Sequence, residues 1–109
     1  MPRWFACPYV NTEVELTDER EQYILGKHDL VANADWAFLA GTLREPQEVR
    51  RSLTDKDARV FLRWYDELER GKYVAVVVID HSESSGRLWV VTSYITDQPR
   101  RGEIEWRRA

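Results

Sequence analysis

Lys27 and His28 are adjacent residues whose side chains could take part in catalysis. Histidine changes its charge near neutral pH, so the imidazole can act as a general acid or a general base, and the lysine adds a positive charge beside it. Both residues fall at the predicted end of a helix, where the helix dipole favours cations. A histidine in this place is also commonly a structural or surface residue, and the sequence leaves both roles open.

Three further side chains have ordinary explanations. Arg63, in a segment of alternating pattern, is either solvated or paired with Glu48 or Asp66. His81 lies in a loop rich in Ser and Gly, and we predict that it is exposed to solvent. Cys7 is the single cysteine, which excludes an internal disulfide and provides no metal-ligand spacing. We therefore predict a small buried hydrophobe at Cys7, and we expect no metal and no cofactor.

The composition predicts one globular domain over residues 1–109. A chain of 109 residues that is 43% hydrophobic and 12% aromatic can bury one core but not two. The net charge of −3 argues against non-specific coating of nucleic acid, although 16 Lys and Arg residues can still form a local patch. No apolar run approaches the ~20 residues of a membrane span, and the N-terminus lacks the layout of a signal peptide. We expect a cytoplasmic protein with no membrane partner.

The elements that must position these residues are organised around a predicted β-hairpin. Tyr73–Ile79 and Arg87–Thr96 are rich in β-branched and aromatic residues, and they flank a break rich in Ser, Gly and Asp. Tyr73–Ile79 is apolar on both faces. Such a strand is typical of the middle of a sheet that has something packed against each side.

Two helices are predicted before this hairpin. Thr17 or Asp18 can cap a first helix that ends at about His28. Asn33 can cap a second helix that continues to about Leu43, with apolar residues at the spacing of one buried face.

The remaining segments predict short extended pieces. Two brief ones are expected within Met1–Leu16, and Glu48–Leu53 predicts a polar strand at a sheet edge. Glu103–Ala109 is predicted to be a short tail whose Ile104 and Trp106 can dock on the sheet. Ala58–Leu68 fits a helical and a strand pattern equally well, so periodicity does not decide its structure.

Short motifs follow one another along most of the chain in the order that is known from one family. They are Phe5-x-Cys7-Pro8, Glu13-Val-Glu-Leu-Thr-x-Glu-Arg20, Tyr23-Ile-Leu-Gly-Lys-His28, Phe61-Leu-Arg-Trp-Tyr65, Gly71-Lys72-Tyr73, Thr92-Ser93-Tyr94 and Gly102-Glu103-Ile104-Glu105-Trp106. This succession resembles small prokaryotic and phage domains of the barnase/EndoU/colicin/RelE-like (BECR) nuclease superfamily. The resemblance implies an α+β fold, with N-terminal helices packed on a curved antiparallel sheet of about four strands.

The resemblance also favours a strand at Ala58–Leu68. We predict that this strand pairs beside Tyr73–Ile79 and turns Val60, Leu62 and Trp64 toward the helices.

The resemblance further implies a site and a function. Its catalytic residues would be His28, Arg63 and Thr92, and its substrate-binding residues would be Lys27, Tyr65 and Tyr94, all converging on the open side of the sheet. Trp106 would be a further substrate-binding residue, as a surface on which a base can stack. Metal-independent RNA cleavage needs a base, cationic donors for the developing phosphorane charge and an acid for the leaving oxygen. The expected function is therefore an RNA-cleaving or RNA-binding domain with a toxin or defence role. Its partners would be RNA and a neutralising protein.

One departure from the family pattern keeps a second hypothesis open. Tyr23 stands where the relatives have a histidine, and Lys27 stands where they have an arginine. A phenol with a pKa near 10 is a poor base at neutral pH unless its surroundings perturb it strongly. The alternative is a non-catalytic interaction domain that keeps the fold and has lost the nuclease activity.

Overall fold

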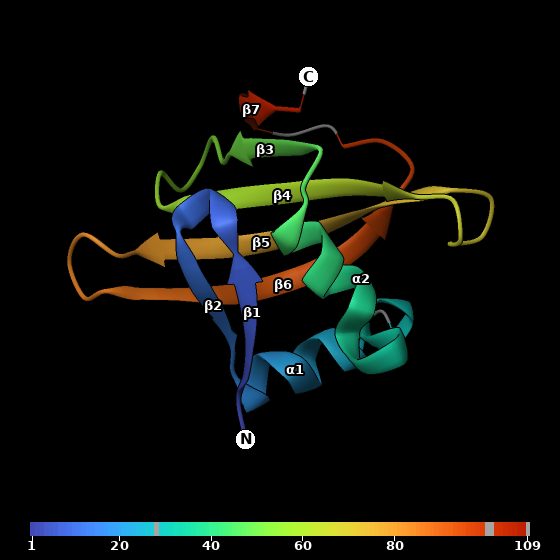
Figure 1. Cartoon of the computed structure of the whole chain (residues 1–109), viewed down its shortest axis with the longest axis horizontal. Helices are drawn as coiled ribbons and strands as arrows, with labels where there is room; N and C mark the ends of the chain where they lie inside the picture. Colours follow the sequence, from blue (N-terminus) through green and yellow to red (C-terminus); the bar gives the residue numbers. More distant parts are fainter. Residues whose placement is uncertain (28, 100–101, 109) are drawn as a thin grey trace.

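A long hairpin lies at the centre of the sheet, as the sequence predicted. Its strands are β5 (Lys72–His81) and β6 (Arg87–Thr96), and they pair antiparallel (Figure 1). The structure is a computed structural model that describes residues 1–27, 29–99 and 102–108. His28 lies outside the described residues, so its predicted role stays a prediction.

The described residues form one sheet of seven strands in the order β1-β2-β6-β5-β4-β3-β7. The other strands are β1 (Arg3–Cys7), β2 (Thr12–Leu16), β3 (Glu48–Arg51), β4 (Ala58–Tyr65) and β7 (Glu103–Arg107). The helices are α1 (Asp18–Leu25) and α2 (Asn33–Arg44), with 3₁₀ turns at Pro8–Val10 and Asp29–Ala32. Neighbouring strands pair antiparallel except β2 and β6, which are parallel where Glu15 lies opposite Trp89.

The predicted architecture is therefore wrong. The sheet is mixed and has seven strands in the described part of the chain, in place of an antiparallel sheet of about four. A β-hairpin, β1 with β2, forms the N-terminus before either helix begins. The extra strands are short, at four or five residues each, and they lie at the two ends of the strand order.

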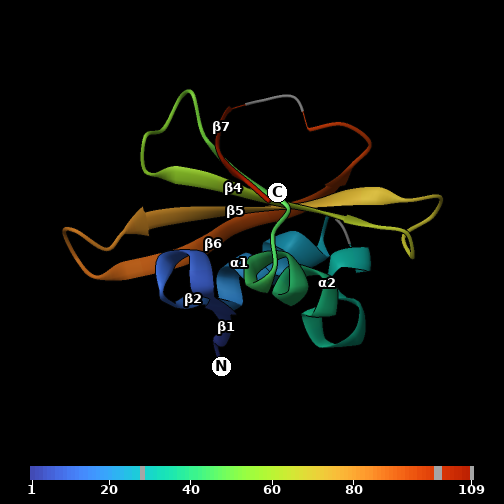
Figure 2. The same ribbon diagram turned by 45° about the horizontal axis from the view of Figure 1, so that its top comes forward.

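Both helices lie against one side of the central strands. Figure 2 shows α1 and α2 on one side of β4, β5 and β6. The core between helices and sheet contains Val74, Val76 and Val78 of β5, together with Ile24 of α1 and Leu39 of α2. Removal of these side chains from water is the main force that holds the helices on the sheet.

The segment that periodicity left undecided is a strand, and the prediction that it pairs with the hairpin is confirmed. Strand β4 pairs antiparallel with β5 from Ala58 opposite Ile79 to Tyr65 opposite Lys72. The prediction that Val60, Leu62 and Trp64 face the helices is wrong. Phe61 and Tyr65 belong to the core, and the Tyr65 ring lies 4.9 Å from that of Phe38 in α2.

Because side chains alternate along a strand, every second residue of the central strands points away from the helices. We call this side the helix-free face; it carries Trp64 of β4, Tyr73, Val77 and His81 of β5, and Trp89, Thr92 and Tyr94 of β6. The register supports this assignment because residues directly opposite each other share a face. Tyr73 lies opposite Trp64, and Val77 lies opposite Thr92.

Several smaller predictions can be compared with the structure. Thr17 caps α1, because its Oγ1 accepts from the Arg20 N–H at 3.2 Å, but the helix ends at Leu25. The extended pieces within Met1–Leu16 are confirmed as β1 and β2. Strand β3 is found, but β7 pairs outside it, so β3 is not an edge strand and the tail does dock on the sheet. Within the described residues, neither helix has the length and apolarity needed to cross a membrane.

Candidate functional site

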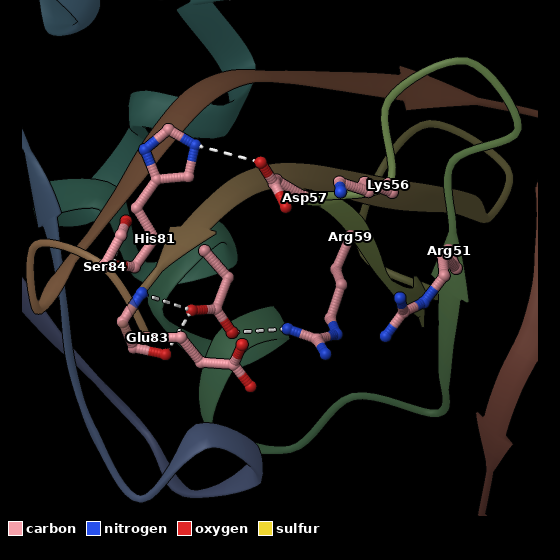
Figure 3. Close-up of a pocket in the computed structure, with 9 residues that line it drawn as sticks. Arg51, Lys56, Asp57, Arg59, His81, Glu83 and Ser84 are labelled. Atoms are coloured by element: carbon pink, nitrogen blue, oxygen red, sulfur yellow. Dashed lines mark hydrogen bonds and ion pairs between the residues drawn. The ribbon is translucent and has the colours of Figure 1, made fainter.

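Two connections meet at one end of the sheet and leave a pocket between them. One is the turn from β3 to β4, and the other is the loop from β5 to β6 (Figure 3). The pocket has a volume of about 340 Å³. We call it the loop pocket; it is lined by Arg51, Lys56, Asp57, Arg59, Asp80, His81, Ser82, Glu83 and Ser84.

The side chains of His81 and Asp57 contact each other at the mouth of the loop pocket. The imidazole Nε2 lies 3.2 Å from Oδ2 of Asp57, and both side chains are about half exposed (Figure 3). A neutral imidazole has one donor and one acceptor nitrogen. With its Nε2–H directed at Asp57, the ring presents Nδ1 as the atom that can accept a proton from another molecule.

The backbone holds these two side chains in place. The Asp80 N–H donates to the Asp57 carbonyl at 2.9 Å, which fixes the start of β4 beside the end of β5. The His81 carbonyl accepts from the N–H groups of Ser84, Ser85 and Gly86 at 3.1, 2.9 and 3.1 Å. The imidazole is further held by Trp89, whose ring centroid lies 5.1 Å away in an edge-to-face arrangement.

The loop geometry follows from local sequence. Asp80 Oδ1 accepts from both the N–H and the hydroxyl of Ser82, at 2.9 and 2.5 Å, an arrangement typical of Asp in turns. Gly86 closes the loop with a φ of 75°, in the left-handed region that favours glycine. The sequence Asp80-His81-Ser82 therefore directs the histidine outward at a fixed turn.

Arg59 ties the loop pocket to the edge strand β7. Its Nη1 donates to Asp80 Oδ2 at 2.5 Å, and its Nε donates to Glu105 Oε2 at 2.9 Å. Arg51 also binds Glu105, at 2.9 Å from Oε1, and the Tyr9 hydroxyl donates to Oε2 at 2.5 Å. We call Tyr9, Arg51, Arg59, Asp80 and Glu105 the charge network.

The charge network shifts the pKa values of its members. Burial raises the pKa of Asp80, but hydrogen bonds from Ser82 and the nearby Arg59 guanidinium outweigh burial and hold this pKa below its usual range. Burial raises the pKa of Glu105 as well, and donation from Tyr9, Arg51 and Arg59 likewise lowers it overall. Burial and the Glu105 carboxylate raise the pKa of Tyr9 to about 12.

The charges around the loop pocket are mixed. Arg51 and Arg59 are neutralised by the carboxylates of the charge network, whereas Lys56 is exposed at the rim. An oriented imidazole can transfer a proton, and Lys56 supplies a positive charge at the rim of the same pocket that can stabilise a developing negative charge.

Two of the predicted site residues, Arg63 and Tyr65, contact the backbone of α2. Tyr65 is buried, and its hydroxyl donates to the Phe38 carbonyl at 2.9 Å. Arg63 lies over the Tyr65 ring, with Nη1 3.4 Å from the Gly41 carbonyl and 4.0 Å from Glu45. Arg63 is thus paired, with Glu45 instead of the expected Glu48 or Asp66.

The other predicted residues are spread over different surfaces. Thr92 and Tyr94 lie on the helix-free face, but Arg63 lies opposite core residue Val74 and so belongs to the helix side. Trp106 contacts Tyr9, with ring centroids 5.9 Å apart. Among the described residues, the predicted catalytic and binding side chains are therefore not brought together in one cleft.

Tyr23, which replaces the relatives' histidine, has a cationic environment. The Lys27 ammonium lies 4.6 Å from the centre of its ring, and the Arg20 guanidinium lies 4.2 Å from it. Lys27, and then Arg20, lower the pKa of the Tyr23 phenol. The predicted substrate-binding residue Lys27 thus contacts Tyr23 on the surface of α1.

The contact between His81 and Asp57 was not predicted, because the sequence pattern placed His81 in a solvated loop. A usable signal was the predicted pairing of Ala58–Leu68 beside Tyr73–Ile79. Antiparallel pairing places the residue before one strand near the end of the other, and here it brings Asp57 to Asp80 and His81.

No group of His, Cys, Asp and Glu side chains suited to hold a metal ion occurs among residues 1–27, 29–99 and 102–108. A scan against protein-family models found no matching family, and searches of curated proteins and of solved structures found no match either.

Proposed function

We propose that this protein binds RNA and cleaves it at the loop pocket, with His81 as the general base. The observation that carries the proposal is the His81–Asp57 pair, which shares one pocket with Arg51, Lys56 and Arg59. The motif resemblance to BECR nucleases supports the same reaction class, although it suggested other residues.

The chemistry follows from the parts of the pocket. His81 Nδ1 takes the proton of a ribose 2′-hydroxyl while Asp57 holds the ring and stabilises the imidazolium that forms. The 2′-oxygen then attacks phosphorus, the bond to the 5′-oxygen breaks, and the leaving oxygen takes a proton from water at the open rim. Lys56 balances the negative charge of the phosphorane. The products are a 2′,3′-cyclic phosphate and a 5′-hydroxyl end.

The proposal is tested by incubating a mixed RNA pool with the protein in the presence of a chelator, which silences contaminating metal-dependent nucleases. We expect cleavage that leaves 2′,3′-cyclic phosphate ends. Asp57→Asn should lower the rate by at least about tenfold, because the ring loses the group that orients it.

Glu83→Gln is the matched control for Asp57→Asn. Both variants remove one carboxylate charge from the loop pocket, but only Asp57 contacts His81. Equal losses in the two variants would show a general charge effect and would count against the oriented imidazole. Failure of the wild type to cleave RNA would favour the non-catalytic interaction domain.

The resemblance also suggests the cellular setting, a toxin or defence protein with a neutralising partner. Expression of the wild type alone should then slow growth and degrade cellular RNA, whereas Asp57→Asn should be tolerated. Free growth on expression of the wild type would contradict the toxin role.

A further inference from the structure

We infer that Tyr9, Arg51 and Arg59 form a phosphate site that Glu105 of β7 occupies, and that a phosphate ligand displaces Glu105 and releases β7. This inference goes beyond the proposed function, because it concerns a ligand that controls the C-terminal strand, and it does not require that the protein cleave RNA. We call Tyr9, Arg51 and Arg59 the oxyanion site.

The Glu105 carboxylate is held in the way that a bound anion is held. Arg51 contacts Oε1 through two nitrogens, Nε at 3.0 Å and Nη2 at 2.9 Å. Oε2 accepts from Arg59 Nε at 2.9 Å and from the Tyr9 hydroxyl at 2.5 Å. A carboxylate has about four lone-pair positions, and these contacts fill them. The oxyanion site is thus a complete set of donors around one anion.

A phosphate group suits these donors at least as well as a carboxylate does. The planar guanidinium group presents its N–H groups in a fork that matches phosphate oxygens. A phosphate dianion also places one more negative charge between the two arginines than Glu105 does. Because Asp80 binds Arg59 through Nη1, the Nε of Arg59 stays directed toward the oxyanion site when Glu105 leaves.

A ligand can reach the oxyanion site from solvent. Arg51 and Arg59 both line the loop pocket, whose volume of about 340 Å³ offers room for a phosphate group (Figure 3). The side chain of Arg51 is 46% exposed, and those of Arg59 and Glu105 are 20% and 21% exposed. A phosphate in the pocket therefore meets the guanidinium groups before Glu105 has left, and it can compete for them.

Strand β7 is held weakly enough to be released. It is the last strand in the order of the sheet, its register with β3 shifts between Val49 and Arg50, and none of its residues belongs to the buried core. Its Ile104 is 46% exposed and its Trp106 is 36% exposed. Elements with few buried apolar contacts open at a lower free-energy cost than core strands do. Loss of the Glu105 contacts should therefore loosen β7 while the central strands stay folded.

The first test replaces the internal anion by an added one. Glu105→Ala leaves the donors without their carboxylate, so inorganic phosphate should bind there and raise the melting temperature. We expect a rise of about 4 °C or more at a phosphate concentration about tenfold above its dissociation constant, compared with sodium chloride of equal ionic strength. Glu21→Ala is the matched control, because Glu21 is 17% exposed and binds a single arginine, Arg3, at 2.6 Å.

The second test measures release of β7 in the unchanged protein. Hydrogen–deuterium exchange of the β7 amides should become at least about threefold faster when phosphate is added, while exchange in β5 stays the same. Inorganic phosphate and adenosine 5′-monophosphate are separate probes. Release by inorganic phosphate alone identifies a site for the free ion, and release by both identifies a site that also takes phosphate esters.

Arg51→Gln should remove the effect of phosphate on β7, whereas Arg87→Gln, which removes an arginine bound to Glu15, should keep it. The inference is overturned if phosphate raises the melting temperatures of Glu105→Ala and Glu21→Ala equally, or if neither probe speeds exchange in β7. Both readouts are independent of RNA cleavage, so either result leaves the proposed function to its own assay.

Discussion

At the scale of single residues, Glu105 contacts side chains from three other elements, and no sequence pattern around it predicted these contacts. Its carboxylate accepts from Tyr9, Arg51 and Arg59, which belong to the first 3₁₀ turn, β3 and β4. Arg59 also donates a hydrogen bond to Asp80 at the end of β5. The charge network therefore fixes the strand ends from which both loops of the pocket begin.

Replacement of Glu105 by Gln tests the strength of this network. The variant keeps the size of the side chain but removes the charge that Arg51 and Arg59 share. Because these groups are only partly buried, we expect the free energy of unfolding to fall by about 1–2 kcal/mol. Urea unfolding measures this loss, and Glu103→Gln, on the same strand and exposed, is the control. Equal stability of the two variants would contradict the role of Glu105.

The charge network also predicts the dependence of stability on acid. The pKa values of Asp80 and Glu105 are lower in the folded protein than their usual values. Groups with a lowered pKa contribute stability above the usual carboxyl range, near pH 4, and lose it as the pH falls through that range toward the folded values. The midpoint of urea unfolding should therefore decrease from pH 6 to pH 3, and less steeply in Glu105→Gln. Identical slopes would show that Glu105 is not involved.

At the scale of elements, local patterns predicted the strands well and their facing poorly. The strand at β4 was predicted from the motif resemblance, because its own pattern fits a helix equally well. The β5–β6 hairpin was predictable from its own residues, because β-branched and aromatic runs flank a clear break. The facing of β4 was not, since Val60, Leu62 and Trp64 alternate with Phe61 and Tyr65, and both sets are apolar. The choice depends on Phe38 of α2, which meets Tyr65 only in the folded chain.

The two glycine turns that flank β5 give a prediction at this scale. Gly71 has a φ of 91°, and a Cβ added there would lie 2.2 Å from Cζ2 of Trp64. Gly86 has a φ of 75°, and nothing lies within 4 Å of an added Cβ. Gly86→Ala should therefore lower stability by about 1 kcal/mol for its backbone alone. Gly71→Ala should cost clearly more, because the Trp64 ring must also move.

Thermal unfolding of both glycine variants measures this difference. Equal melting temperatures for Gly71→Ala and Gly86→Ala would show that Trp64 does not pack over Gly71 in solution, and would weaken the description of the helix-free face.

At the scale of the whole molecule, the pairing of strands that are distant in sequence determines the parts of the fold that the sequence pattern did not predict. Strands β2 and β6 meet at Glu15 and Trp89, and β7 pairs with β3 across the sheet from its neighbour in sequence. Such contacts join segments that are distant in sequence, and the pattern of each segment carries no information about its partner. The prediction of the site had the same limit, because Asp57 directly precedes β4 and His81 ends β5, and the two meet through the register of β4 with β5.

The most direct test of the proposed function uses the fact that the chain has 2 histidines. The measurement is the initial rate of cleavage of a mixed RNA pool, with chelator present, by the wild type, His81→Ala and His28→Ala. We predict that His81→Ala lowers the rate by about 10²–10⁴-fold, the range for a lost general acid or base, and that His28→Ala changes it little. A large loss in His28→Ala with a nearly normal rate in His81→Ala would contradict the assignment of His81 and return the reaction to the residues that the motif resemblance suggested.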